Sequence, residues 1–366
     1  MKNNESVPTL KELIFSLCSV MSVSGFEERG GKALCESLGK YFDRYETDAV
    51  GNHMFFMDCA KKGAPTALID AHFDEIGLIV TDALDGGFLR IAQMGGIDPS
   101  IMQASDVVIY ASEPLRGTVV STPPHLRKGA KELPEITEML VDTGLSLKKE
   151  ELSALIPTGT PIGFPPLYSS LGCVGELGEQ LVGKSFDNKA CAAAAAWALM
   201  NTPREELAAN VCLLLSSYEE TSRLGGVSPA VFKVAPDYAM VIDVNLARVP
   251  DTKSFETVPL GKGISISYSA ATDRRLTRAV RALCEEKELP FCTVAAATST
   301  GTNATSVNLI GAGVPVADVG LPLKNMHTYN EVIALRDAET LASLVREFVC
   351  SSELAESFGR EEGDAQ

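Results

Sequence analysis

Residues 211–220, Val211-Cys212-Leu213-Leu214-Leu215-Ser216-Ser217-Tyr218-Glu219-Glu220, join an apolar run to a pair of acids. An apolar run bounded by polar residues predicts a central strand in a sheet that is covered on both faces. The two glutamates then stand where that strand ends, and side chains at consecutive positions diverge. One of them could hold a cation while the other faces a bound water, which is the division of labour that metal-assisted hydrolysis needs. An isolated Glu-Glu pair is more often part of a solvated loop, so the hypothesis needs ligand-type residues at other strand ends.

Such residues follow other apolar runs of the sequence. They are His72 and Asp74 after 66–71, Asp187 after 181–186, Asp243 after 238–242, and His327 in the loop after 314–319. Sites in open α/β sheets form beyond the carboxyl ends of the strands, so these groups could converge. His72 and Asp74, two positions apart in an extended segment, point to the same side, and a carboxylate there can orient a ligating imidazole. A lone histidine at a strand end is more often a hydrogen-bonded core residue, so His72 and Asp74 alone do not establish a metal site.

The composition is that of a folded globular protein. The chain has 366 residues, of which 45% are apolar and 22% charged, and this length suits two domains better than one. No run of eighteen apolar residues occurs, which argues against a transmembrane helix. The first six residues, Met1–Ser6, lack the basic flank and apolar segment of an export signal, so we expect the chain to be cytoplasmic.

The cysteines and the net charge indicate the redox compartment of the protein and the kind of partner it binds. The nine cysteines include no Cys-x-x-Cys pair, which indicates reduced thiols and not a disulfide framework or a zinc knuckle. The net charge of −16 disfavours nucleic acid and anionic lipid as partners. It suits a positively charged small ligand, although solubility alone also explains it.

The hydrophobic pattern changes twice along the chain. Helical and strand patterns fill residues 1–75, and short alternating runs between Gly and Pro residues fill 76–166, which predicts a small all-β module. From 167 to 366 the α/β pattern resumes, with a helix opened by Asp187, strands near 263–268 and 291–296, and helices over 273–289 and 337–354. The predicted fold is therefore an α/β sheet flanked by helices, in two segments (1–75 and 167–366), with an inserted β-rich domain (76–166).

Five short motifs together resemble the M42 metallo-aminopeptidases, which include TET-type peptidases and glutamyl aminopeptidases. They are Ala71–Gly77, Phe186–Ala190, Tyr218–Glu220, Ile242–Val244 and Met326–Thr328. Gly95–Asp98, Pro123–Leu126, Ile156–Gly163 and Pro259–Gly263 also look like the family, so the resemblance runs from about residue 10 to 350. It implies a metallopeptidase sheet whose inserted β domain mediates dimerisation and builds a larger particle, expected to be a dodecamer.

The resemblance also implies a dinuclear site. The ligands of two divalent metals would be His72, Asp187, Glu220, Asp243 and His327, with Asp187 bridging the pair. Zinc or cobalt fits these nitrogen and oxygen donors, and manganese is not excluded by ligand type. Glu219 would be the general base and Asp74 would orient His72. The substrates would be short peptides with a free N-terminus.

The sequence departs from the family pattern in the segments 221–225 and 245–250 and at three single residues. Asn188 stands where a second acid usually follows the bridging Asp, Tyr218 where Gln is frequent, and Asn303 where Asp is frequent. None is an expected ligand, but such neighbours set side-chain preference and rate. Two alternatives therefore stay open. One is an N-acyl amino acid deacylase or related amidohydrolase on the same metals. The other is a non-catalytic, metal-stabilised assembly protein, which would have no need of Glu219.

Overall fold

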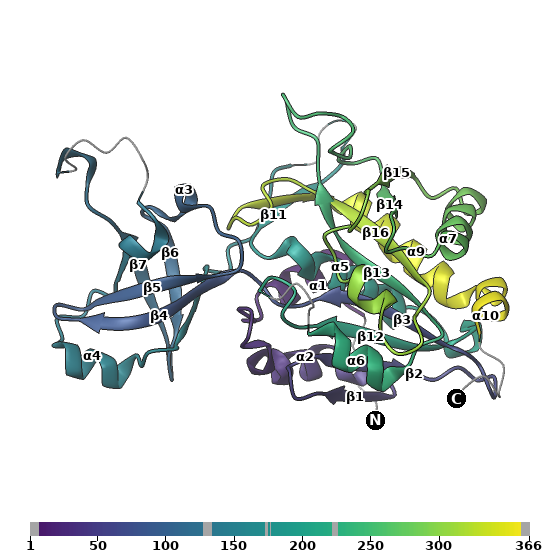
Figure 1. Cartoon of the computed structure of the whole chain (residues 1–366), viewed down its shortest axis with the longest axis horizontal. Coiled ribbons are helices and arrows are strands. Elements are labelled where there is room, and N and C mark those ends of the chain that lie inside the picture. Colours follow the sequence, from purple (N-terminus) through teal and green to yellow (C-terminus); the bar gives the residue numbers. More distant parts are fainter. Residues whose placement is uncertain (1–6, 127–133, 173–174, 176, 222–225, 360–366) are drawn as a thin grey trace.

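The computed structural model of the chain describes residues 7–126, 134–172, 175, 177–221 and 226–359. Figure 1 shows two bodies joined side by side, a helix-covered sheet and a small barrel. Residues 1–6, in which the sequence predicts no export signal, lie outside the described residues. None of the helices in the described ranges combines the length and the apolar character that a bilayer-spanning segment requires.

The larger body is built on an eight-stranded sheet of order β1-β2-β12-β3-β13-β16-β14-β15. Its strands are β1 (Arg44–Thr47), β2 (His53–Met57), β3 (Thr66–His72), β12 (Asn210–Ser216), β13 (Tyr238–Leu246), β14 (Ile264–Tyr268), β15 (Phe291–Ala295) and β16 (Val316–Leu323). The neighbours β12, β3, β13 and β16 run parallel, so their carboxyl ends share one edge. Every residue of β12 after Asn210 is buried, as predicted for a strand covered on both faces.

Helices cover both faces of this sheet. On one face lie α1 (Leu10–Cys18), α5 (Phe186–Met200), α7 (Arg274–Glu286) and α9 (Leu335–Cys350), and on the other lie α6 (Val227–Val234) and α8 (Ala304–Asn308). Strand residues alternate between the two apolar clusters: Leu213 and Leu215 join the first, Cys212 and Leu214 the second. Ala192–Ala196 of α5 are fully buried. Alanine combines high helix propensity with a small side chain, so α5 can lie close to β3 and β13.

The smaller body is a closed barrel. Its strands are β4 (Gly77–Leu84), β5 (Phe88–Met94), β6 (Asp106–Tyr110), β7 (Pro114–Val120), β8 (Leu140–Asp142) and β9 (Pro161–Gly163), in the order β4-β5-β8-β7-β6-β9. The short helices α3 (Pro99–Met102) and α4 (Lys149–Leu155) accompany it. Leu78, Ile109 and Val141 belong to a separate apolar core inside the barrel. Closure pairs every strand edge, which a free-standing small sheet needs to avoid aggregation.

The remaining elements of the described residues are a second small sheet, two further helices and five short 3₁₀ turns. A three-stranded sheet consists of β10 (Ser169–Ser170), β11 (Gln180–Gly183) and β17 (Glu331–Ala334). The other helices are α2 (Gly31–Leu38) and α10 (Ser352–Phe358), with 3₁₀ turns η1 (Glu27–Gly30), η2 (Gly39–Tyr41), η3 (Pro124–Leu126), η4 (Ile136–Glu138) and η5 (Arg204–Glu206).

The structure confirms the predicted class, an α/β sheet flanked by helices, and corrects three details. Asp243 lies within β13 and not after it, because β13 pairs with β16 as far as Leu246. Asp187 follows a strand of the small sheet, not of the central one, and its ψ of 108° is not helical although α5 includes it. The predicted closing helix is two helices, since Ser351 ends α9 and caps α10 by accepting the Leu354 N–H.

Candidate metal centre

The candidate ligands meet at the carboxyl edge of the parallel strands. His72 ends β3, and Ser216, which pairs with it, ends β12, so Glu219 and Glu220 follow directly. Asp243 comes from β13, next to β3 in the sheet. Asp187 comes from the start of α5 and His327 from the loop between β16 and β17.

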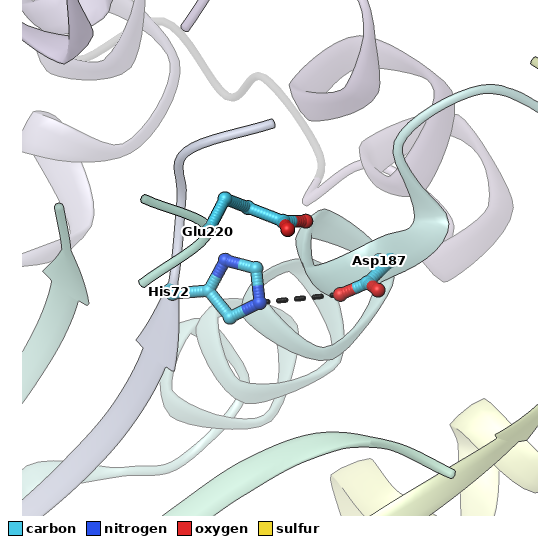
Figure 2. Close-up of side chains that lie close together, drawn as sticks. All are labelled: His72, Asp187 and Glu220. Atoms are coloured by element: carbon cyan, nitrogen blue, oxygen red, sulfur yellow. Dashed lines mark hydrogen bonds and ion pairs between the residues drawn. The ribbon is translucent and has the colours of Figure 1, made fainter. Parts of the chain in front are cut away.

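Asp187 lies at the middle of this group. Its Oδ1 is 3.1 Å from His72 Nε2 and its Oδ2 is 3.5 Å from His327 Nε2. Each oxygen of one carboxylate thus faces a different imidazole, and Figure 2 shows the first of these contacts. His72, Asp187 and Glu220 each offer a ligand atom within 4.8 Å of the others. A carboxylate held between two imidazoles is suited to bridging two cations.

The two consecutive glutamates face different parts of the site. Glu220 Oε2 is 3.2 Å from His327 Nε2, and Glu219 Oε2 is 4.0 Å from His72 Nε2. The Glu219 side chain is 21% exposed and that of Glu220 only 4%. Asp243 Oδ1 is 3.6 Å from His72 Nε2. Glu219 is therefore the carboxylate of the pair that solvent and a substrate can reach.

Asp74 holds the backbone of both glutamates. Its two carboxylate oxygens accept the N–H groups of Glu219 and Glu220, each at 3.0 Å. The Asp74 main-chain carbonyl oxygen lies 3.1 Å from His72 Nδ1, closer than its carboxylate at 3.5 Å. The backbone carbonyl is thus the nearer partner of the imidazole, which leaves His72 Nε2 directed towards Asp187.

Burial and charge shift the protonation of the site. Burial raises the pKa of Glu219 to about 8 and that of Glu220 to about 7. Hydrogen bonds to Asp187 and Glu220 raise the pKa of His327 to about 11. Burial alone would raise the pKa of Asp187, but hydrogen bonds from the two histidines lower it. Several buried carboxylates so close together repel one another unless cations compensate them.

Three buried charged residues near the candidate site lie outside the sequence prediction. Glu27 is buried and accepts the Tyr218 N–H at 3.0 Å, and Glu331 accepts the N–H groups of Asp187 and His327. Lys189, the one charged residue after Asp187 in α5, is buried and lies 3.2 Å from Glu75. The sequence did offer a signal for two of them: Lys189 is a lone charge in an apolar helix, and Glu331 is a charge at the start of an apolar strand. Such a charge needs a buried partner.

The group opens into a cavity of about 530 Å³ lined by His72, Asp187, Glu219, Glu220, Asp243 and His327, together with Gly96, Val244, Asn245, Leu246, Thr300, Gly301, Thr302 and Met326. The structure thus brings all the predicted ligands and Glu219 to one cavity, while Asp74 lies behind it. Imidazole nitrogens and carboxylate oxygens at this spacing fit a divalent metal such as zinc, cobalt or manganese.

Comparison with known proteins agrees with this geometry. Residues 51–344 match the family described as M42 glutamyl aminopeptidase. A lysyl aminopeptidase of Pyrococcus furiosus is 26% identical over 342 residues, which cover 92% of this chain and 95% of that protein. An aminopeptidase from the archaeon Desulfurococcus kamchatkensis is 26% identical with a TM-score of 0.86, covering 95% of this chain and 97% of that one. A Pyrococcus horikoshii TET1 peptidase that can assemble into a tetrahedron or a large octahedral shell is also 26% identical, with a TM-score of 0.79 and coverage of 93% and 99%. This chain therefore belongs to the M42 aminopeptidase family.

Proposed function

We propose that the chain removes N-terminal residues from short peptides at a centre of two divalent metal ions. Its membership of the M42 family makes it a peptide hydrolase. The observation that carries the dinuclear site is that the two oxygens of Asp187 face two different imidazoles, those of His72 and His327.

One ion would be coordinated by His72 and Asp243, and the other by His327 and Glu220. Asp187 would be shared between the two ions. The distances support this division, because Asp243 Oδ1 is 3.6 Å from His72 Nε2 and Glu220 Oε2 is 3.2 Å from His327 Nε2. When bound, such ions supply Lewis-acid activation of a water and polarisation of the scissile carbonyl. The donor types accept zinc, cobalt or manganese.

Glu219 would carry the proton. Its carboxylate takes a proton from the attacking water and gives it to the nitrogen of the departing amine, so the base returns to its starting state. Its partial exposure to the cavity supports this role. Asp74 would act through the backbone, by holding the N–H groups of Glu219 and Glu220. A substrate's free α-ammonium would find carboxylates on several sides of the cavity.

The described cysteines are unpaired thiols, as is typical of a reducing compartment, and we propose that the enzyme acts in the cytoplasm.

The barrel, residues 76–166, would mediate dimerisation within a larger particle. The TET1 peptidase of Pyrococcus horikoshii supports the assembly by its tetrahedral and octahedral shells. Light scattering should give a mass several times that of the 38.9 kDa chain, and a monomeric mass would contradict the role given to the barrel.

Replacing Glu219 with Gln tests the mechanism. The variant keeps the shape of the side chain but cannot accept the proton, so kcat/KM on aminoacyl chromophore substrates should fall by about 10²–10⁴. Metal content, measured by elemental analysis after dialysis, should remain at two ions per chain. Glu219→Gln with wild-type turnover would refute the base assignment.

The same assays separate the alternatives. Wild-type enzyme loaded with zinc or cobalt should cleave substrates with a free amino group and leave N-acetyl amino acids intact. Turnover of the acetylated compounds alone would identify a deacylase. No turnover of either class with zinc, cobalt or manganese would favour the non-catalytic assembly protein.

A further inference from the structure

We propose that Glu331 is a positioning residue of the metal centre, which fixes the backbone of Asp187 and His327 so that their side chains face each other. The inference rests on the proposed function in one respect, that Asp187 and His327 hold metal. Glu331 itself is not among the residues that line the cavity of about 530 Å³.

Glu331 links two segments of the chain that are far apart in the sequence. It opens β17 and is only 2% exposed. Its Oε2 accepts the Asp187 N–H and its Oε1 accepts the His327 N–H, both at 3.0 Å. Both carboxylate oxygens are thus occupied by the main chain of residues whose side chains converge. One rigid group therefore sets the separation of the two backbones.

The loop that carries His327 does not need Glu331 to close. Lys324 and Val332 exchange two backbone hydrogen bonds, at 2.9 and 3.0 Å, across its base. Within the loop, the Thr328 hydroxyl donates to the Asn325 carbonyl at 2.8 Å, and the Asn325 amide donates to the Asn330 carbonyl at 3.1 Å. Since these contacts shape the loop, the Glu331 carboxylate is left with the task of orienting His327 relative to Asp187.

The backbone at His327 needs such a restraint. Its φ is +60°, a left-handed conformation that only about a few per cent of non-glycine residues adopt, although histidine adopts it more often than most. Such a residue persists only where its surroundings over-determine it. The Glu331 carboxylate, which holds the His327 N–H, supplies one of these constraints directly at the strained residue.

The test replaces Glu331 with Gln. An amide has one acceptor oxygen, so one of the two N–H groups loses its partner and meets the amide's NH₂ instead. Cobalt is titrated into chelator-treated protein and followed by its visible ligand-field absorption, which reports affinity and coordination geometry. We expect cobalt affinity to fall by about 10- to 100-fold, with an altered spectrum at saturation. Glu331→Asp, which keeps the carboxylate, should recover part of the affinity.

Asp337 provides a matched control. Its buried carboxylate likewise accepts two backbone N–H groups, from Gly261 at 2.6 Å and Gly263 at 2.7 Å, and neither belongs to the metal centre. Asp337→Asn should therefore lower the thermal stability but leave cobalt affinity and spectrum as in the wild type. A merely structural role for Glu331 would make the two variants behave alike.

Each result of the cobalt titrations either supports or contradicts the proposed role of Glu331. Wild-type cobalt affinity and spectrum in Glu331→Gln, or equal losses in Glu331→Gln and Asp337→Asn, would overturn the proposal. If Glu331→Gln does not fold, the comparison of Glu331→Asp with the wild type takes its place. Wild-type protein that binds cobalt but cleaves no peptide would refute the proposed function and leave the role of Glu331 intact. Wild-type protein that binds no cobalt would overturn both.

Discussion

Asp70 and Asn303 form a buried carboxylate–amide pair beneath the metal centre. Both are within the core, with 0% and 5% exposure, and the Asn303 Nδ2 donates to Asp70 Oδ2 at 3.1 Å and to Ser216 Oγ at 3.0 Å. Asn303 is one of the departures from the family pattern, and its contact with Asp70 explains it. A carboxylate at 303 would meet another carboxylate in a site away from water.

Exchanging the two side chains should show this dependence. Asn303→Asp alone leaves two buried acids in contact, so we expect it to destabilise the fold by about 1–3 kcal/mol. Asp70→Asn combined with Asn303→Asp restores one amide and one carboxylate and should recover most of that loss. Thermal unfolding of the two single variants and the double variant gives the interaction energy. A double variant no more stable than Asn303→Asp would show that the pair is not coupled.

The buried strands were the most predictable elements, and contacts between residues far apart in the sequence were the least predictable. The run before Ser216 predicted β12, and the run before His72 predicted β3, because apolar residues in sequence report burial directly. The end of β13 was misplaced, since its last residues are fixed by pairing with β16. Glu27 and Glu331 were not found because their role depends on N–H groups of distant residues. A lone charge beside apolar residues indicates that a buried partner is needed, but the local pattern does not say which distant residue is that partner.

The loop after β5 brings the barrel into the metal centre. A Cβ added at Gly96 would lie 3.1 Å from Nδ1 and 3.4 Å from Cε1 of His327. Any side chain at position 96 would therefore push the imidazole by a few tenths of an ångström. Strand β5 belongs to the barrel (Figure 1), whereas His327 lies in the loop between β16 of the central sheet and β17. The barrel thus limits where the imidazole can lie, independently of any role in assembly.

Gly96→Ala should accordingly displace His327. We expect kcat/KM to fall by about 10- to 100-fold, because small misplacements of a catalytic centre have effects of this size. Gly39→Ala is the control: Gly39 has φ −54° and ψ −33°, and its added methyl would meet only the Cys35 side chain at 3.3 Å. The control should keep wild-type kcat/KM. Equal activity of Gly96→Ala and wild type would mean that the ring has room to move.

Glu75 ties together distant segments of the sheet body at the point where the chain leaves it for the barrel. It lies between β3 and β4, is 3% exposed, and bonds to Lys184 and Ser185 after β11. Lys189 of α5 lies 3.2 Å from its carboxylate, and the Ser22 N–H donates to it at 3.2 Å. The segment after β3, the segment after β11 and helix α5 therefore share one buried ion cluster, directly before the chain enters the barrel. Removing the single carboxylate would leave two buried lysines without it, which is costly.

The cluster predicts how stability depends on pH. Burial alone would raise the pKa of Glu75, but Lys184 and Lys189 lower it from 4.5 to about 2. A carboxylate whose pKa is lower in the folded than in the unfolded state stabilises the fold fully above the unfolded value. The contribution of Glu75 should therefore be complete above about pH 4.5 and should disappear as the pH falls to about 2.

The measurement is thermal unfolding of chelator-treated wild type and Glu75→Gln between pH 7 and pH 2. The wild type should melt at the higher temperature at pH 7, and the difference should shrink below pH 4.5, since all other acids are common to both proteins. A difference that stays constant down to pH 2 would show that the charge of Glu75 does not stabilise the fold.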